Sequence, residues 1–177
     1  MRIEIREPGS EAFYRETVNA ACQYRALLKK PTRRLKDMFQ SLRGNIILCG
    51  ALLILMSALT ALDGWDALRS AALVLLAVDV AFSALYLRNL RQMLRTLMND
   101  RRSSVLTLDD EGVELDKEGA QRIRAAWDNV AFARVFRESI CFVTKDGGGF
   151  VLSVSRRYEK ELLAYLRDQR SGLTIIE

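Results

Sequence analysis

The sequence predicts an α+β membrane protein, in which a two-helix transmembrane hairpin carries a C-terminal antiparallel β-meander closed by a helix. Two apolar runs of 18 residues, 45–62 and 70–87, lie only seven residues apart. Beyond residue 102, six short segments rich in β-branched and aromatic residues alternate with turn residues. We therefore expect three parts: an N-terminal strand with juxtamembrane helices (1–42), the hairpin (43–88) and a cytoplasmic domain (103–177).

The first seven residues alternate between apolar and charged side chains, with Ile3 and Ile5 on one face. A lone strand cannot bury such a face, so we expect it to add a strand to the C-terminal sheet. Ser10 is the predicted N-cap of the next helix, whose apolar side chains recur at helical spacing up to Pro31. The apolar stripe over residues 35–42 predicts either an amphipathic helix on the inner leaflet or an extension of the first span.

The two apolar runs contain a single ionisable acid or base, Asp79. A helix rises 1.5 Å per residue, so each run nearly crosses the ~30 Å hydrocarbon core of a bilayer. Because hydrocarbon offers no partner to backbone amides, each run must be helical there. The alternative is a buried helical hairpin of a soluble protein, but buried helices seldom run this long without charge.

Basic residues flank the open end of the predicted hairpin. Residues 29–43 hold six basic residues and one acid, and residues 88–102 hold five and one, whereas loop 63–69 holds two Asp and one Arg. Basic flanks remain in the cytoplasm, so we predict a multi-pass protein of the cell membrane with both termini cytoplasmic. Net charge is +7 over residues 1–102 (16 basic, 9 acidic) and −2 over 103–177 (11 basic, 13 acidic). Positive charge beside the spans favours anionic inner-leaflet lipids, and not nucleic acid, as a partner.

Asp79 lies in the middle of the second run, where an ionised carboxylate costs about 2.5–3.5 kcal/mol to insert. Ser83 and Tyr86 follow at i+4 and i+7, which predicts a polar stripe on one helix face. In an antiparallel hairpin the residues of the first run at this depth are about 52–54. These offer no donor, and Cys49 and Ser57 each lie roughly a turn away. We therefore expect Asp79, Ser83 and Tyr86 to form an intramembrane polar contact with a protein partner or a second copy. The alternative is a protonated Asp79 held by Ser83 or by water.

The C-terminal part contains six predicted strands, at residues 105–108, 113–115, 121–127, 130–136, 139–144 and 150–154. A helix follows, with Ser155 as its predicted N-cap and Gly172 at its end. Trp127 is predicted to be a core anchor between strands.

Three polar motifs in this part have a functional and a structural interpretation. The acidic cluster 109–111 is predicted to be a solvated turn and not a calcium loop. The glycines 147–149 are predicted to be a hairpin turn and not a phosphate cradle. Arg156 and Arg157 would oppose the dipole at a helix start, so they predict contact with an anionic headgroup or acidic partner, or simple exposure to solvent.

Several of these features together resemble the YcxB-like family of small bacterial membrane proteins. They are the stretch LTLDDEGVEL at 106–115, the WDNV at 127–130, the hairpin after it, the pair Arg156-Arg157 and the terminal helix. The order of N-terminal strand and helix, two spans and C-terminal domain is similar as well. The resemblance implies a pleckstrin-homology-like (PH-like) domain and a place in the bacterial inner membrane. It implies no established reaction and no catalytic residue.

Composition excludes several kinds of chemistry. The chain has no His, which excludes Ser–His–Asp and Cys–His catalysis, and its three Cys are far apart. We expect no cofactor and no structural metal site. The sequence therefore predicts a non-enzymatic membrane protein with a cytoplasmic binding or regulatory domain. The alternatives are an accessory subunit of a larger membrane transport or signalling complex, or a homo-oligomeric membrane assembly.

Overall fold

The computed structural model describes residues 1–5, 9–100, 102–119, 122–145, 151–169 and 172–177. The chain forms two compact units. One unit combines Met1–Leu35 with Leu94–Glu177, and we call it the sheet unit. The other is Lys36–Met93, and we call it the hairpin unit. Predicted features at residues 6–8, 121 and 147–149 lie wholly or partly outside the described residues.

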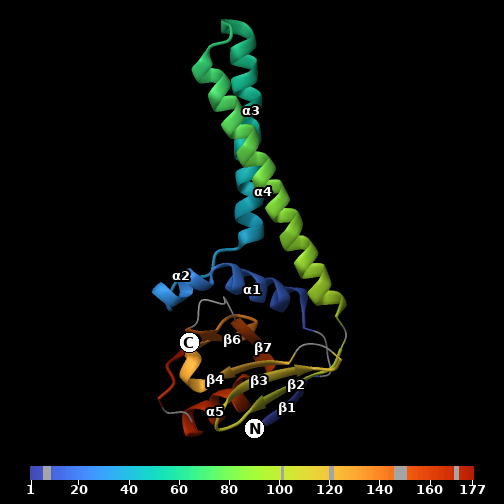
Figure 1. The fold of residues 1–177 in the computed structure, drawn as a ribbon, viewed down its shortest axis with the longest axis vertical. Coiled ribbons are helices and arrows are strands. Elements are labelled where there is room, and N and C mark those ends of the chain that lie inside the picture. Colours follow the sequence, from blue (N-terminus) through green and yellow to red (C-terminus); the bar gives the residue numbers. More distant parts are fainter. Residues whose placement is uncertain (6–8, 101, 120–121, 146–150, 170–171) are drawn as a thin grey trace. The chain divides into compact units, whose positions relative to one another are not determined.

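The hairpin unit is built from two long helices (Figure 1). These are α3, Met38–Asp63, and α4, Ala67–Asn99, whose last turns belong to the sheet unit. Three residues, 64–66, join them. Both predicted runs are helical. Asp37 caps α3 by accepting hydrogen bonds from the backbone N–H of Phe39 (3.1 Å) and Gln40 (3.3 Å). Since α3 already starts at Met38, the stripe before the first run extends that helix, and residues 31–37 form no separate amphipathic helix.

The sheet unit contains two four-stranded sheets. The first has the order β1-β2-β3-β4 and is antiparallel throughout, with β1 at Arg2–Ile5, β2 at Ser104–Leu108, β3 at Gly112–Lys117 and β4 at Ile123–Ala126. Ile3 pairs with Leu106 and is 6% exposed. The prediction that the N-terminal strand joins the C-terminal sheet is therefore confirmed.

The second sheet has the order β7-β6-β5-β8. Its strands are β5 at Val130–Val135, β6 at Ser139–Thr144, β7 at Val151–Ser155 and β8 at Ile175–Ile176. Strands β5 to β7 form an antiparallel meander, as predicted, whereas β8 pairs in parallel with β5. No pattern in the sequence predicts β8, because two residues are too few to show alternation.

Trp127 lies between β4, the last strand of the first sheet, and β5 of the second sheet. The predicted strand 121–127 ends at Ala126, and Trp127–Asn129 forms a 3₁₀ turn leading into β5. The indole Nε1 donates a hydrogen bond to the carbonyl oxygen of Asp109 at 2.8 Å. Its ring meets Phe142 of the second sheet edge-on, with centroids 6.3 Å apart. Trp127 thus anchors the two sheets to each other.

Three shorter helices complete the sheet unit: α1 at Glu11–Cys22, α2 at Tyr24–Lys29 and α5 at Glu159–Gln169. Ser10 caps α1 as predicted, since its Oγ accepts from the N–H of Phe13 at 3.1 Å. Helix α1 packs on β6 and β7, while α5 contributes Leu162 and Leu166 to the core that both sheets share.

The predicted N-cap role of Ser155 is wrong. Ser155 is the last residue of β7, where it pairs with Ser139, and its side chain makes no capping bond. The chain then passes through a 3₁₀ turn, Arg156–Tyr158, before α5 begins. Helix α5 ends at Gln169, three residues before Gly172.

Candidate functional site

A polar cluster joins the two helices of the hairpin unit. The side-chain amide of Asn45 on α3 donates to Asp79 Oδ2 (2.7 Å) and to Ser83 Oγ (2.9 Å) on α4. Cys49 Sγ donates to Asn45 Oδ1 at 3.6 Å. The structure thus brings together two of the three residues predicted for an intramembrane contact. The third, Tyr86, is exposed on the surface of α4.

The expectation that residues 52–54 lie at the depth of Asp79, so that no donor of the first run reaches it, is wrong, and the reason is the stagger of the hairpin. Asn45 lies 18 residues before the end of α3 (63 − 45), whereas Asp79 lies 12 residues after the start of α4 (79 − 67). At 1.5 Å per residue these stretches are about 27 Å and 18 Å long. Measured from the loop, Asn45 therefore lies about 9 Å further along α3 than Asp79 lies along α4. The two helices are staggered by this amount, which brings Asn45 to the level of Asp79.

Asp79 remains at the surface of the hairpin despite this bond. Its side chain is exposed, whereas Ser83 is 7% exposed and Asn45 is half-buried. Asn45 therefore satisfies one carboxylate oxygen from within the hairpin and leaves the group accessible from outside it.

Apolar side chains cover most of the surface of both helices. Only 6% of the most apolar 18-residue window of α3, and 17% of that of α4, is buried within the fold. Ile47 and Ile54 are each 73% exposed, and Leu75 and Phe82 are each 69% exposed. Both helices are long and apolar enough to span a membrane.

The two arginines of the predicted pair, Arg156 and Arg157, lie in different environments. Both residues lie in the 3₁₀ turn, and the first turn of α5 carries Glu159 and Glu161 instead. Arg156 Nε pairs with Glu159 Oε2 at 2.5 Å, which raises the pKa of the guanidinium. Arg157 is exposed, with its guanidinium 4.9 Å from the centre of the Tyr158 ring. Arg157 also lines a cavity.

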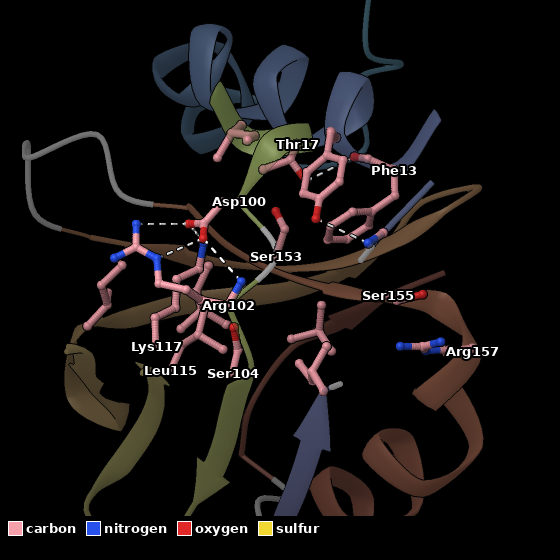
Figure 2. Close-up of a pocket in the computed structure, with 17 residues that line it drawn as sticks. Phe13, Thr17, Asp100, Arg102, Ser104, Leu115, Lys117, Ser153, Ser155 and Arg157 are labelled. Carbon is pink, nitrogen blue, oxygen red and sulfur yellow. Dashed lines mark hydrogen bonds and ion pairs between the residues drawn. The ribbon is translucent and has the colours of Figure 1, made fainter. Parts of the chain in front are cut away.

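This cavity has a volume of about 210 Å³ and lies within the sheet unit, between α1 and strands of both sheets. Figure 2 shows Phe13 and Thr17 of α1 on one side of it, and Ser153 and Ser155 of β7 beside them. The apolar part of the wall comes from six elements, through Ile5, Phe13, Leu97, Leu115, Ile123 and Leu152. Because these residues are scattered along the chain, no local sequence pattern indicates the cavity.

Three charged lining residues, Asp100, Arg102 and Lys117, lie together on one side of the cavity, and Arg157 lies on the other side (Figure 2). Asp100 Oδ1 accepts from Arg102 Nε at 2.8 Å, and Asp100 Oδ2 accepts from Lys117 Nζ at 3.2 Å. The hydrogen bond from Arg102, assisted by Lys117, lowers the pKa of Asp100 from 3.8 to about 2. Asp100 is therefore ionised at neutral pH and links the end of α4 to β3.

Cys141 contacts Ser153, which lines the cavity. It is fully buried in β6, with Sγ 3.2 Å from Ser153 Oγ and 3.5 Å from Ser139 Oγ. Burial raises the pKa of the Cys141 thiol to about 11, so it remains protonated at neutral pH.

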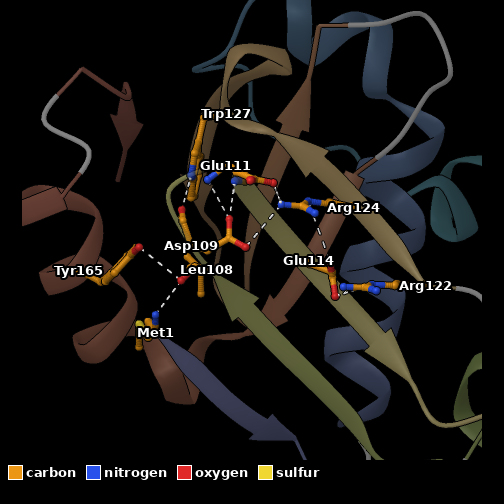
Figure 3. Close-up of polar contacts among 10 residues, drawn as sticks. Met1, Leu108, Asp109, Glu111, Glu114, Arg122, Arg124, Trp127 and Tyr165 are labelled. Carbon is orange, nitrogen blue, oxygen red and sulfur yellow. Dashed lines mark hydrogen bonds and ion pairs between the residues drawn. The ribbon is translucent and has the colours of Figure 1, made fainter.

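The acidic cluster at 109–111 is a structured turn, as predicted (Figure 3). Asp109 Oδ1 accepts from the backbone N–H of Glu111 (2.9 Å) and Gly112 (2.8 Å), which lowers the pKa of Asp109. Arg124 pairs with both Asp109 and Glu111. Gly112 is required at this turn, since a Cβ there would lie 2.3 Å from the carbonyl oxygen of Ala125. Across the described ranges, no three His, Cys, Asp or Glu side chains are grouped to hold a metal ion.

Comparison with known proteins gives no match: no family model, no curated protein and no solved structure is similar to this chain. Function is therefore inferred from the residues and their geometry.

Proposed function

We propose that this chain is a non-enzymatic integral membrane protein that anchors a binding or regulatory domain, the sheet unit, to the cell membrane through the hairpin unit. The observation that carries this proposal is the exposure of the two apolar helices, whose most apolar windows are only 6% and 17% buried. Exposed apolar area on this scale in water would cost about 25 cal/mol per Å² and would promote aggregation. Lipid removes that cost.

Long apolar helices also occur in soluble cores and in signal sequences, but neither role fits this chain as well. The core helix of a soluble protein is mostly buried, whereas Ile54 and Phe82 lie 73% and 69% exposed. A cleaved signal sequence lies near the N-terminus, whereas α3 starts at Met38, after β1, which is paired into the first sheet.

The proposed orientation places both termini and the sheet unit in the cytoplasm. The basic flanks support it, with six basic residues in 29–43 and five in 88–102. The same residues would attract anionic lipids of the inner leaflet, at about 1 kcal/mol for each basic residue near the surface. Nucleic acid is not proposed as a partner.

We further propose that the sheet unit is PH-like and that the chain is related to the YcxB-like family. Support comes from the order of its elements, which are four antiparallel strands, a three-stranded meander and then α5. In such a unit the sheets form a scaffold, and binding is the expected role. This proposal assigns no catalytic residue.

A second candidate function is a subunit role, either in a homo-oligomer or as an accessory subunit of a transport or signalling complex. The observation that favours it is the exposed position of Asp79. A carboxylate at the surface of a lipid-embedded helix costs several kcal/mol unless another helix covers it. The small residues Ala77 and Ala81 flank Asp79 and would allow a close approach.

The proposal of membrane anchoring is tested by alkaline extraction of the full chain from cell membranes. An integral protein remains in the pellet after washing with alkaline carbonate and enters solution only with detergent. Release of the chain by carbonate alone would mean that the apolar helices do not span the bilayer and would overturn the proposal.

A further inference from the structure

We propose that residues 24–35 of the sheet unit, which we call the basic segment, dock as a folded surface on the anionic headgroups of the bilayer, with Arg134 as the residue that positions them. This inference rests on the proposed membrane anchoring and deepens it, because it names the surface that contacts lipid. Three observations support it: unpaired positive charge, the packing beneath that charge, and the short distance along the chain to the first span.

The positive charge of the basic segment is not neutralised within the fold. Five of its basic side chains are exposed: Arg25, Lys29, Lys30, Arg33 and Arg34. The chain holds no acidic residue between positions 16 and 37. Among the described residues, none of the five pairs with a carboxylate, whereas Arg102, Arg124 and Arg156 elsewhere in the sheet unit each do. The five charges are therefore available to an anionic ligand.

Helix α2 holds the first of these charges on an outward face. Arg25 and Lys29 lie one turn apart and are exposed, so they share a face of the helix. Tyr24 and Leu27, which are 4% and 1% exposed, are buried in a cluster with side chains of β5 and β6. The hydroxyl of Tyr24 also donates to the carbonyl oxygen of Thr144 at 2.9 Å. The helix is thus fixed to the second sheet by its apolar side.

Arg134 of β5 fixes the loop that follows α2. Its guanidinium donates to the backbone carbonyl oxygens of Arg33 at 2.6 Å and Thr32 at 3.4 Å, and also to that of Pro31. The side chains of Arg33 and Arg34 remain exposed. Three carbonyl groups bound by one guanidinium restrict the backbone of this loop, so its cations belong to a defined surface and not to a flexible tail.

Connectivity favours lipid over an acidic protein as the partner of this surface. Leu35 packs against the same cluster as Tyr24, and Asp37, two residues later, caps α3. Only residues 38–44 of α3, about 10 Å of helix, separate this cap from the first apolar run. The headgroup layer is ~5–8 Å thick on each side of the bilayer, and attraction between charges extends about 8 Å further at physiological salt. The basic segment is therefore tethered within reach of the headgroups.

The experiment is photo-crosslinking of the full chain in phosphatidylcholine vesicles. These contain a trace of phosphatidylglycerol or of phosphatidylcholine, each with a diazirine at the same position close to the headgroup, and mass spectrometry maps the cross-links. We expect residues 24–35 to give at least about fivefold more cross-links with phosphatidylglycerol, the effect of one or more basic residues near an anionic surface. Equal cross-linking by the two lipids would overturn the proposal and would point to an acidic protein as the partner. Alkaline extraction of the same vesicles tests anchoring separately, so the two failures are distinguishable.

Two matched double variants test whether a defined surface binds the lipid. Lys29→Gln combined with Lys30→Gln should lower the excess of phosphatidylglycerol cross-links by about fivefold or more. Arg2→Gln combined with Lys160→Gln also removes two exposed cations, from β1 and α5, and should leave the excess unchanged. Equal effects of the two double variants would mean that total charge, and not the basic segment, attracts the lipid.

Arg134→Lys tests the positioning role, because it keeps the charge but cannot bind three carbonyl groups at once. The excess at residues 24–35 should fall towards none, while cross-links to residues 88–95 of α4, which are also basic, should persist. Arg137→Lys, at an exposed position after β5, is the control. An unchanged excess in Arg134→Lys would contradict the positioning role. If this variant lowers the melting temperature, the double variant of Lys29 and Lys30 still decides whether the segment docks.

Discussion

At the scale of single residues, Asp79 tests whether the hairpin unit associates with another helix. Asn45 bonds one of its oxygens, and the side chain is still exposed. Asp79→Leu should insert at least as well, because a costly group is removed, but should weaken assembly by about 0.6–2 kcal/mol. Asp79→Asn should retain much of the association. Cross-linking in membranes measures this. Assembly of the leucine variant at the original level would mean that Asn45 and Ser83 alone satisfy Asp79.

Asp100 predicts a dependence of stability on pH. Its folded-state pKa of about 2 lies below the ordinary 3.8, so the unfolded chain binds the proton more tightly. The resulting stabilisation is present above about pH 4 and is lost as the pH falls towards 2. Thermal melts of Asp100→Asn and the original chain should therefore differ at neutral pH and converge between pH 4 and 2. The exposed Asp168→Asn is the control. A difference that stays constant over this range would contradict the assignment.

At the scale of elements, one carboxylate attaches α1 to the second sheet. Glu16 accepts from Ser139 Oγ (2.6 Å) and from the backbone N–H of Glu138 (2.9 Å) and Arg137 (3.2 Å). Glu16→Gln keeps one acceptor oxygen but removes the charge, so we expect a loss of about 1.5–3 kcal/mol in unfolding free energy. Glu11→Gln, at the exposed start of the same helix, is the control. Denaturant unfolding of the two variants to equal extents would contradict this role.

A charged substitution on the apolar surface of α3 should have little effect if this surface lies in water and a large effect if it lies in lipid. Ile54 is 73% exposed and lies near the middle of the first apolar run. At the surface of a soluble protein, Ile54→Arg would change stability by less than about 0.5 kcal/mol. In a bilayer it should cost about 2.5–3.5 kcal/mol of insertion, so we expect depletion from the membrane fraction. If the variant were found in the membrane fraction as often as the original chain, this result would contradict a membrane-spanning α3.

The elements that could be predicted from the sequence are those with a local pattern. Strands β2 to β7, the two apolar helices and the Ser10 cap depend on alternation, length and a single capping hydroxyl. The partnership of Asn45 with Asp79 could not be predicted, because it depends on a stagger of about 9 Å between two helices. The cavity could not be predicted either, because Phe13, Ile123 and Leu152 meet only in the folded unit.

At the scale of the whole molecule, the two compact units also differ in charge and polarity. The hairpin unit, Lys36–Met93, holds both apolar runs, and the sheet unit holds the shared core of the two sheets. Basic residues concentrate at the two junctions, in 29–43 and 88–102. This pattern is the one expected of an anchor in lipid that carries a folded domain in the cytoplasm.

Accessibility of introduced cysteines in intact cells tests this account most directly. The background is Cys22→Ser, since Cys22 is exposed. A membrane-impermeant maleimide should label Trp65→Cys, in the exposed loop between α3 and α4, from outside. It should label Lys160→Cys, on the exposed side of α5, only after the cells are permeabilised. Labelling of Lys160→Cys in intact cells, or of Trp65→Cys only after permeabilisation, would contradict a hairpin that crosses the membrane with the sheet unit inside.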